Sequence, residues 1–460
     1  MLAHDDTIAA IATPPGVGGI GIVRVSGRDA EKICHALFRS PTVAGPLKSH
    51  HLYHGDIISP TTGEPVDEVL IALMRGPRSY TGEDVLEIQC HGGSLILQAV
   101  LNEVIKAGGR PAEPGEFTKR AYLNGRMDLA QAEAVMDLIT ARTDRGRALA
   151  LTGVKGGLSE TLHAIRSDLI DLLSSLESVI DFNEEDISPG SRPIAPGDIE
   201  DIITRINAIL ATYREGKLFR DGLTVVITGR PNVGKSSLLN RLLGERRAIV
   251  TPTPGTTRDF IEETVNIGGI PVTLTDTAGV RKAAEAVEKE GIAFVWEKVL
   301  AADIVIILVD GSEPLTEEDI EVIERNREKR VVLAVNKSDL PHRVTDIRLG
   351  ELMPGMEPLW ISAKYGDGIP DLQKRIHTLA AEGGTDTGSD IILANLRHKA
   401  ALEATVASLA AAHAILSRGN FPELAAFDLK EALDHLGDIA GETTAEDVLD
   451  RIFSRFCVGK

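Results

Sequence analysis

The stretch from Gly229 to Ser236, GRPNVGKS, restricts the fold more than any other part of the chain. It has the spacing G-x-x-x-x-G-K-S and lies between a strand-like segment, LTVVIT, and a helix-like segment, SLLNRLLG. A phosphate-binding loop needs this order because its backbone N–H groups surround phosphate oxygens at the start of a helix. A glycine turn with an incidental lysine is the alternative, and the strand–loop–helix order disfavours it. The motif predicts an α/β nucleotide-binding domain.

Later motifs indicate that the nucleotide is a guanine nucleotide. PGTTRD (254–259) can order a loop around a γ-phosphate, and DTAG (276–279) follows a strand-like segment. NKSD (336–339) follows another strand, and its Asp339 can accept hydrogen bonds from guanine N1–H and the exocyclic amine. Adenine has no N1–H, so an unpaired carboxylate would reject ATP. ISAK (361–364) adds a backbone contact to the base, and all these motifs occur in G-protein order.

Each motif assigns roles to particular residues. Lys235 is expected to reach the β and γ oxygens of GTP, and Ser236 and Thr257 are expected to coordinate Mg²⁺. Asp276 would lie in the second shell of the magnesium ion, and the Gly279 amide near the γ-phosphate. The expected GTP contacts are Asn232, Val233, Gly234, Lys235, Ser236, Ser237, Thr251, Pro252, Thr253, Pro254, Gly255, Thr256, Thr257, Asp276, Thr277, Ala278, Gly279, Asn336, Lys337, Asp339, Ser362, Ala363 and Lys364.

The residue after DTAG is unusual for a GTP-hydrolysing protein. Ras-type enzymes have a glutamine there that orients the attacking water, and this chain has Val280. Because valine carries no hydrogen-bonding group, another residue must take over this role.

The chain of 460 residues has a length typical of three domains. Residues 1–118 read as mixed α/β, with strands at TIAAIAT and GIGIVRVSG and a helix at GSLILQAVLNEVIKAG. Residues 119–215 belong to a long helical stretch that runs from about Glu116 to Phe182 and resumes after a Pro/Gly-rich segment. Residues 216–379 alternate between strand and helix, and residues 380–460 are helical again. We therefore expect one helical domain with the P-loop domain inserted into it.

Composition excludes several classes of protein. The net charge of −19 argues against general nucleic-acid affinity, so RNA binding would need a local basic patch or a basic partner. Three scattered cysteines, Cys34, Cys90 and Cys457, indicate neither a disulfide framework nor a metal cluster and fit a cytoplasmic location. The first residues, MLAHDDTIAA, carry acids where an export signal would have bases, so export is not expected. No uninterrupted apolar run reaches membrane-spanning length, so no membrane association is expected.

GVGGIG, residues 16–21, matches the dinucleotide-binding pattern G-x-G-x-x-G. That pattern should open a helix, but the following IVRVSG is strand-like, so a turn between strands is the better interpretation.

Motifs outside the P-loop domain carry a more specific resemblance. They are ATPPGVGGIGIVRVSG, SYTGEDVLEIQCHGG, PGEFTKRAYLNGRMDLAQAEAVMDLI and the terminal FCVGK. With them the chain resembles the bacterial tRNA-modification GTPases of the MnmE (TrmE) family over its whole length. Val458 departs from the isoleucine usual in the family's terminal motif.

The resemblance implies an N-terminal α/β domain that binds folate and dimerises, a central helical domain, and a Ras-like G domain inserted into the helical domain. It also implies a heterotetramer with an FAD-dependent partner, MnmG (GidA). Together the two proteins would add an aminomethyl or carboxymethylaminomethyl group at C5 of the wobble uridine of certain tRNAs. The one-carbon unit would come from 5-formyl- or 5,10-methylene-tetrahydrofolate.

The same resemblance implies roles that the residues alone do not show. A potassium ion held by Asn232, Thr251, Thr253 and Thr256 would neutralise charge in the transition state. Glu288 would orient the attacking water in place of the missing glutamine. Taken alone, Asn232 could equally be a turn residue, and Glu288 a solvated helix carboxylate.

The resemblance places folate at Arg24, Glu87, Arg126 and Lys460, because a carboxylate suits the pterin N–H groups and cations suit the glutamate tail. We expect the apolar side chains of Phe456 and Val458 to be buried and thereby to hold the C-terminal tail in place. This would bring Cys457, a candidate catalytic thiol, close to the folate. A small structural thiol is the alternative for this cysteine.

Two other functions remain open. A ribosome-assembly GTPase would need an RNA-binding KH-like domain or a second G domain, and neither is evident in the sequence. A regulatory GTPase without modification chemistry would use the flanking domains only for interactions, and folate binding would separate it from the enzyme.

Overall fold

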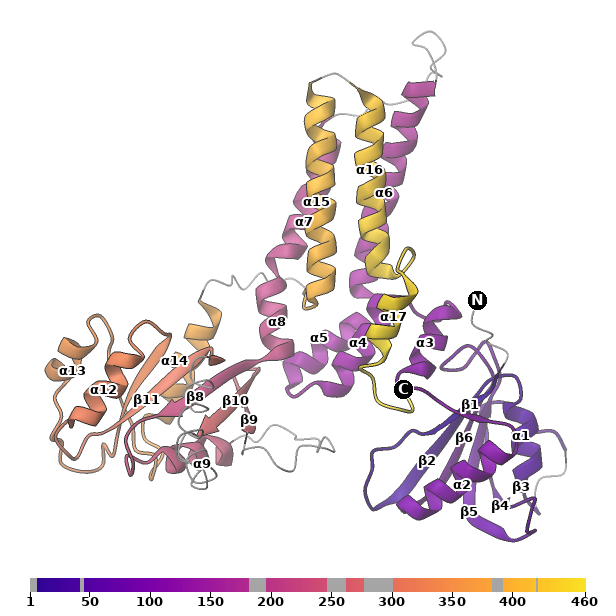
Figure 1. Ribbon diagram of the computed structural model, residues 1–460, viewed down its shortest axis with the longest axis horizontal. Helices are drawn as coiled ribbons and strands as arrows, with labels where there is room; N and C mark the ends of the chain where they lie inside the picture. The colour runs from indigo at the N-terminus through magenta and orange to yellow at the C-terminus, as the bar shows by residue number, and fades with distance from the viewer. Residues whose placement is uncertain are drawn as a thin grey trace. The chain divides into compact units, whose positions relative to one another are not determined.

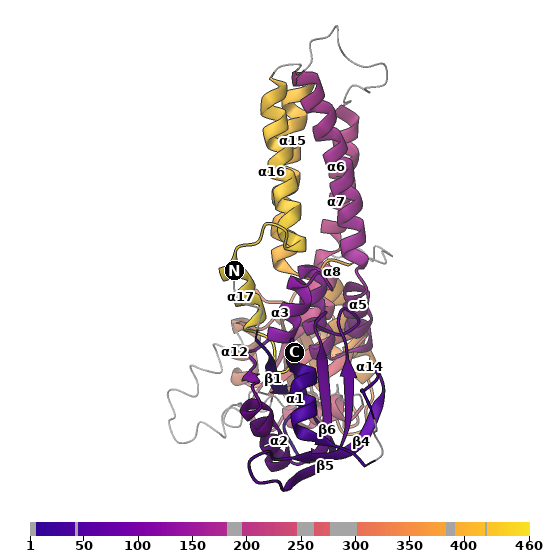
Figure 2. The ribbon, with the colours of Figure 1, turned by 90° about the vertical axis from the view of Figure 1, so that its right-hand side faces the viewer.

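The computed structural model describes residues 6–41, 45–181, 196–245, 262–276, 301–382, 392–418 and 421–460. The chain forms two compact units, shown in Figures 1 and 2. The first unit contains residues 1–136 and 436–460, and the second contains residues 137–435.

The first unit is built on a seven-stranded sheet with the order β3-β4-β5-β6-β2-β1-β7. Alternation of side chains decides its two faces: along β2, Val23 and Val25 are fully buried, whereas Arg24 between them points to the other face. Helices α1 and α2 cover the apolar face. The strands are β1 Ile8–Ile11, β2 Gly18–Ser26, β3 Phe38–Arg39, β4 Leu52–Ile58, β5 Pro65–Met74, β6 Val85–Gly92 and β7 Arg110–Pro111, and the helices are α1 Ala30–Leu37, α2 Ser94–Lys106 and α3 Glu116–Leu123.

The strand β2 includes most of GVGGIG, so this sequence extends a strand and does not open a helix. The prediction that no helix starts here is confirmed, and β1 and β2 pair in antiparallel orientation. The predicted turn covers only Gly16 and Val17 of this sequence, because residues 18–21 already belong to β2.

The C-terminal segment folds back onto the first unit. Helix α17, Glu446–Phe453, packs on α3, and Phe453 and Phe456 join a buried cluster with Leu129. Phe456 is only 6% exposed, as expected, but Val458 is 54% exposed, so the expectation that both side chains bury the tail was wrong for Val458. Hydrogen bonds to the carbonyls of Cys457 and Gly459, from the Gly115 amide and from Arg24, hold the last residues in place of the Val458 side chain.

The second unit contains a six-stranded sheet with the order β13-β12-β11-β8-β10-β9. All neighbouring strands are parallel except β9 and β10, which form an antiparallel hairpin. Continuous apolar strands such as β11 are buried on both faces, as parallel sheets require. The strands are β8 Leu223–Thr228, β9 Glu262–Ile267, β10 Ile270–Asp276, β11 Ile304–Asp310, β12 Val331–Asn336 and β13 Leu359–Trp360, and the helices are α9 Lys235–Glu245, α12 Glu317–Arg325, α13 Asp346–Leu352 and α14 Ile369–Ala381.

Helices from both sides of the P-loop domain lie together in the second unit. Figures 1 and 2 show α6, α7, α15 and α16 side by side, and α7 packs directly on α15. The helices that precede the P-loop domain are α4 Leu129–Thr140, α5 Asp144–Val154, α6 Gly157–Asp181, α7 Pro196–Ala211 and α8 Tyr213–Asp221, and those that follow it are α15 Leu396–Ser417 and α16 Pro422–Ala440.

The long helical stretch expected from Glu116 to Phe182 is divided into several helices. Thr143 caps α5 by accepting a hydrogen bond from the Gly146 amide at 3.1 Å. Gly156, at φ +87°, separates α5 from α6. The composition favours helix throughout, but the cap at Thr143 and the positive φ of Gly156 divide the stretch into separate helices.

α15 is long and apolar enough to cross a membrane. A core helix of a soluble protein can have the same length and composition. α15 reaches this hydropathy although the sequence has no uninterrupted apolar run of membrane-spanning length. One side of α15, with Leu402, Leu409 and Ala412, is fully buried, and the helix packs on α7. These contacts indicate a bundle helix.

Candidate functional sites

The predicted phosphate loop has the geometry that its sequence requires. It follows β8, and α9 begins at its Lys235. Gly234 has φ +103°, and a Cβ atom there would lie 2.3 Å from Nδ2 of Asn336, so no other residue fits. The Lys235 ammonium donates to the carbonyl oxygens of Gly229 and Arg230, each at 2.8 Å, and therefore lies across the loop.

The base-binding motifs are joined to this loop through Asn336, which is 3% exposed. Its Nδ2 donates to the Val233 carbonyl at 2.8 Å, and its Oδ1 accepts from the Ala363 amide at 3.0 Å. The Ser362 hydroxyl donates to Oδ1 of Asp339 at 2.7 Å. Hydrogen bonds thus join three segments far apart in sequence into one candidate nucleotide site.

Arg230, the second residue of the phosphate loop, pairs with carboxylates. Its Nη2 lies 2.5 Å from Glu313 and its Nε lies 3.2 Å from Asp319. The hydrogen bond from Arg230 to Glu313 is the main cause of its raised pKa. We interpret Arg230 as an anchor of the loop.

Several predicted residues lie outside the described part of the chain. β9 begins just after the segment with PGTTRD, and β10 ends at Asp276 of DTAG, so one hairpin joins both γ-phosphate motifs. The predicted residues outside the described ranges are Thr251, Pro252, Thr253, Pro254, Gly255, Thr256, Thr257, Thr277, Ala278, Gly279 and Glu288.

A second cluster of predicted residues forms in the first unit. Arg24 and Glu87 are cross-strand neighbours on β2 and β6, and Nε and Nη2 of Arg24 donate to Oε1 of Glu87 at 3.0 and 2.9 Å. The Arg24 guanidinium lies 5.5 Å from the ring centroid of Tyr80 and 5.8 Å from that of Phe117. The two rings hold the guanidinium in place.

The chain terminus completes this cluster. Nη1 of Arg24 donates to the Gly459 carbonyl at 3.2 Å. Gly459 has φ +94°, and a Cβ atom there would lie 2.6 Å from the Ile11 carbonyl oxygen. Burial, followed by the charge of Arg24, lowers the pKa of the Lys460 ammonium, and Glu87 and Cys457 counter this effect. Three of the four predicted folate residues, Arg24, Glu87 and Lys460, therefore lie within electrostatic reach of one another, and Lys460 is also within reach of Cys457.

The fourth predicted folate residue, Arg126, is exposed, and its Nε donates to the Ser79 carbonyl at 3.1 Å. Ser79 precedes Tyr80, so Arg126 is linked to the segment that flanks Arg24. The sequence did not indicate Tyr80, Phe117 or the Gly459 carbonyl, because an aromatic ring or a backbone oxygen near a charge has no motif of its own.

The three cysteines differ in burial. Burial is the main factor that raises the pKa of Cys34 and Cys90 to about 12, whereas Cys457 is exposed. Because the thiolate is the nucleophile, an aromatic disulfide reagent at about pH 7 should modify one thiol per native chain rapidly. Counting released thiolate by absorbance, with Cys457→Ser as the control, measures this. Rapid reaction of any thiol in the Cys457→Ser protein would contradict the assignment.

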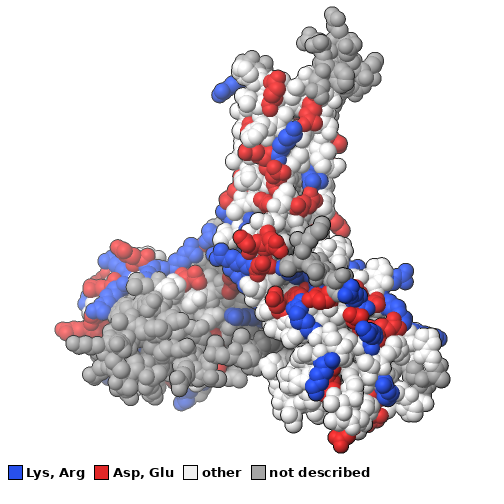
Figure 3. Space-filling model, turned by 45° about the vertical axis from the view of Figure 1, so that its right-hand side comes forward, with Lys and Arg blue, Asp and Glu red and all other residues white. Residues whose placement is uncertain are grey.

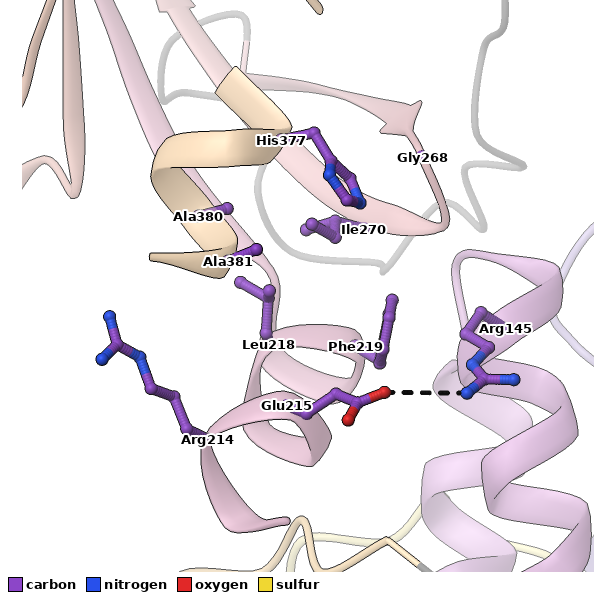
Figure 4. Close-up of a pocket in the computed structure, with 10 residues that line it drawn as sticks. All are labelled: Arg145, Arg214, Glu215, Leu218, Phe219, Gly268, Ile270, His377, Ala380 and Ala381. Atoms are coloured by element: carbon purple, nitrogen blue, oxygen red, sulfur yellow. Dashed lines mark ion pairs between the residues drawn. The ribbon is translucent and has the colours of Figure 1, made fainter. Parts of the chain in front are cut away.

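A cavity of about 420 Å³ lies within the second unit, beside the turn of the β9–β10 hairpin. Figure 4 shows Leu218 and Phe219 of α8 below it, His377 of α14 above it, and Arg145 directed toward Glu215, 3.6 Å away. A Cβ atom at Gly268 would lie 2.4 Å from the His377 ring. The turn of the hairpin that joins the γ-phosphate motifs thus lies against α14 and α8, the helices on the two sides of the cavity.

Comparison with known proteins identifies the family. A family model described as the TrmE N-terminus of a GTP-binding protein matches residues 7–126, and one described as the MnmE helical domain matches residues 129–457. A tRNA modification GTPase MnmE from Syntrophus aciditrophicus is 50% identical over 99% of both chains. The chain belongs to the MnmE family. The MnmE protein of Geobacter metallireducens is 45% identical, again over 99% of both chains.

Among solved structures, the chain is similar to the G domain of the Thermotoga maritima FeoB iron transporter. The identity is 26% over 34% of this chain and 98% of that chain, with a TM-score of 0.27, too low for an argument about fold.

Membership in the MnmE family confirms several predictions. The chain combines a TrmE-type N-terminal α/β domain, an MnmE helical domain and a P-loop G domain, as the sequence predicted. It is a GTPase involved in tRNA modification.

Proposed function

We propose that this GTPase acts with the FAD-dependent protein MnmG to add an aminomethyl or carboxymethylaminomethyl group at C5 of the wobble uridine of certain tRNAs. It would do so in the cytoplasm, as a homodimer paired through residues 1–118 and as a heterotetramer with MnmG. The helical domain would comprise residues 119–215 and 380–460, and the G domain residues 216–379. The meeting of Arg24, Glu87 and the C-terminal residues is the observation that supports a modification site best.

The residues of this cluster fit a reduced folate. Glu87 offers carboxylate oxygens to the paired N–H groups of a pterin, and Arg24, Arg126 and Lys460 offer cations to its carboxylates. The rings of Tyr80 and Phe117 flank Arg24 and supply apolar surface. A bound tetrahydrofolate would supply the one-carbon unit, and Cys457, exposed and three residues from the terminus, would be its neighbouring thiol.

The G domain fits Mg²⁺ and K⁺. Ser236 lies at the start of α9, where a hydroxyl can meet a phosphate-bound magnesium ion with Thr257. Asn232 has φ +66°, a conformation that asparagine tolerates, and its side chain is exposed. It would hold potassium together with Thr251, Thr253 and Thr256, while Glu288 orients the water that Val280 cannot.

We expect GTP hydrolysis to require potassium and to be slow in sodium. Sodium is smaller and should sit poorly among ligands spaced for potassium, so it would neutralise less of the charge in the transition state. The measurement is phosphate release at equal ionic strength in potassium, ammonium and sodium chloride. Equal rates in potassium and sodium would contradict the proposed ion site.

RNA recognition is expected to depend on MnmG. On the face shown in Figure 3, Lys and Arg are interspersed with Asp and Glu over both units, and the net charge is −19. A broad basic surface of the kind that binds phosphates without a partner is not visible among the described residues of that face.

Direct binding of 5-formyl-tetrahydrofolate, measured by calorimetry on the full chain, tests the modification site. Binding that Glu87→Gln abolishes would support it. No binding by the folded protein would favour the alternative, a regulatory or ribosome-assembly GTPase without modification chemistry of its own.

A further inference from the structure

Asp310 is a buried carboxylate beside the base-binding motifs to which the proposed function gives no role. It is the last residue of β11 and is 3% exposed. Its Oδ2 accepts a hydrogen bond from the Lys337 ammonium at 2.5 Å. Its Oδ1 accepts from the Ser312 amide at 2.9 Å and from the Ser312 hydroxyl at 2.6 Å. Both carboxylate oxygens are therefore engaged within hydrogen-bond distance.

Lys337, the second residue of NKSD, is held at both ends. Its backbone has φ +65°, which a residue with a side chain adopts only when its surroundings impose it. The preceding Asn336 is bonded to Val233 and Ala363, and the Lys337 carbonyl accepts from the Leu340 amide at 3.0 Å. Asp310 fixes the other end through the ammonium.

A lysine fixed in this way presents its carbon chain as a surface. The Lys337 side chain is 34% exposed, so part of it remains open next to Asp339 in the same motif. The hydrocarbon stem of a lysine can cover an apolar surface while its charged end binds elsewhere. The flat face of a purine is such a surface.

We propose that Asp310 is a positioning residue for guanine nucleotides, which holds Lys337 so that its carbon chain packs against one face of the base. The inference rests on the proposed guanine site at Asn336 and Asp339. Asp310 does not touch the nucleotide itself and acts only through Lys337. A side chain ordered before binding loses less conformational entropy when the ligand arrives, so affinity rises without a new contact.

The charge of Asp310 matters for this role. Burial alone would raise its pKa, but the hydrogen bonds from Lys337 and Ser312 outweigh burial and lower it. The group is therefore a carboxylate at neutral pH. Asparagine would preserve its size and could still accept from Ser312, but it would remove the charge that attracts Lys337.

The test measures release of fluorescent GDP and GTP from the full-length protein by stopped flow. Asp310→Asn should accelerate release of both nucleotides about tenfold, which is the scale of freeing one long side chain. The rate of hydrolysis at saturating GTP should stay unchanged while KM rises, because the phosphates remain bound by the P-loop. Lys337→Ala should accelerate release by at least as much.

A double-mutant cycle separates positioning from a general structural role. If Asp310 acts through Lys337, Asp310→Asn should change release less than about twofold in the Lys337→Ala protein. Asp303→Asn is the matched control, since this exposed carboxylate, which directly precedes β11, accepts a hydrogen bond from the Thr224 amide at 2.8 Å. It should leave nucleotide release unchanged.

Three results would contradict this role of Asp310. Equal effects of Asp310→Asn with and without Lys337 would overturn the inference, as would a fall in the melting temperature with unchanged release. If Lys337→Ala itself left release unchanged, the assignment of NKSD to the base would fail, and the role of Asp310 with it.

Discussion

Replacing Asp339 with asparagine is expected to lower kcat/KM for GTP by about 10⁴-fold. The carboxylate can accept from both N1–H and the 2-amino group of guanine, and the asparagine amide would set a donor against a donor at one of these positions. Xanthine has an oxygen in place of the 2-amino group and suits the amide. The same variant should therefore hydrolyse XTP efficiently, and phosphate release from both nucleotides measures the exchange.

Asp371→Asn is the control for this prediction, because Asp371 is an exposed carboxylate in the first turn of α14 in the same domain. It should keep the preference for GTP. A loss of both GTP and XTP hydrolysis in the Asp339→Asn protein would indicate disruption of the Ser362 contact, not recognition of the base.

Deleting residues 457–460 is expected to lower tRNA modification by about 10²-fold or more while GTP hydrolysis stays close to normal. The deletion removes Lys460 and the Gly459 carbonyl that binds Arg24, so the folate would lose a cation and the geometry around the guanidinium. Small displacements in a site that positions reactants can cost about 10²-fold in rate. Nucleoside mass spectrometry of tRNA treated with both partner proteins, alongside phosphate release, measures the two activities.

Val458→Ala is the matched control, since this side chain is 54% exposed and should be dispensable. Cys457→Ser distinguishes a catalytic thiol from a merely neighbouring one: modification is lost in the first case and retained in the second. Normal modification by the truncated protein would show that the tail has no part in the reaction.

The nucleotide site could be predicted in detail because its motifs bind through backbone geometry. GRPNVGKS requires a strand before it and a helix after it, and the structure has β8 and α9 there. Likewise, the periodic segment GSLILQAVLNEVIKAG became α2 over nearly the predicted residues. Local physical requirements were sufficient in both cases.

Other features depend on contacts between distant residues. Only two strands of the N-terminal sheet were expected, and the remaining strands are defined by pairing across the sheet. Val458 was expected to be buried as an apolar residue, but it is 54% exposed, and a hydrogen bond from Arg24 to the Gly459 carbonyl holds the tail. Asp310 was missed because a carboxylate at the end of a buried strand reveals its purpose only when Lys337 lies beside it.

The segment that leaves the G domain is anchored at Thr212 and α8, which lead into that domain, and this has a consequence for the order of folding. The Leu393 amide donates to the Thr212 hydroxyl at 2.9 Å across a separation of 181 residues, and a Cβ atom at Gly216 would lie 2.1 Å from the Leu393 carbonyl. Closing so long an unstructured loop is entropically costly, but a folded G domain already brings its own ends together. On the ribosome, α7 is made long before α15. We expect the G domain to fold first, with α7 exposing its apolar face until α15 emerges to cover it.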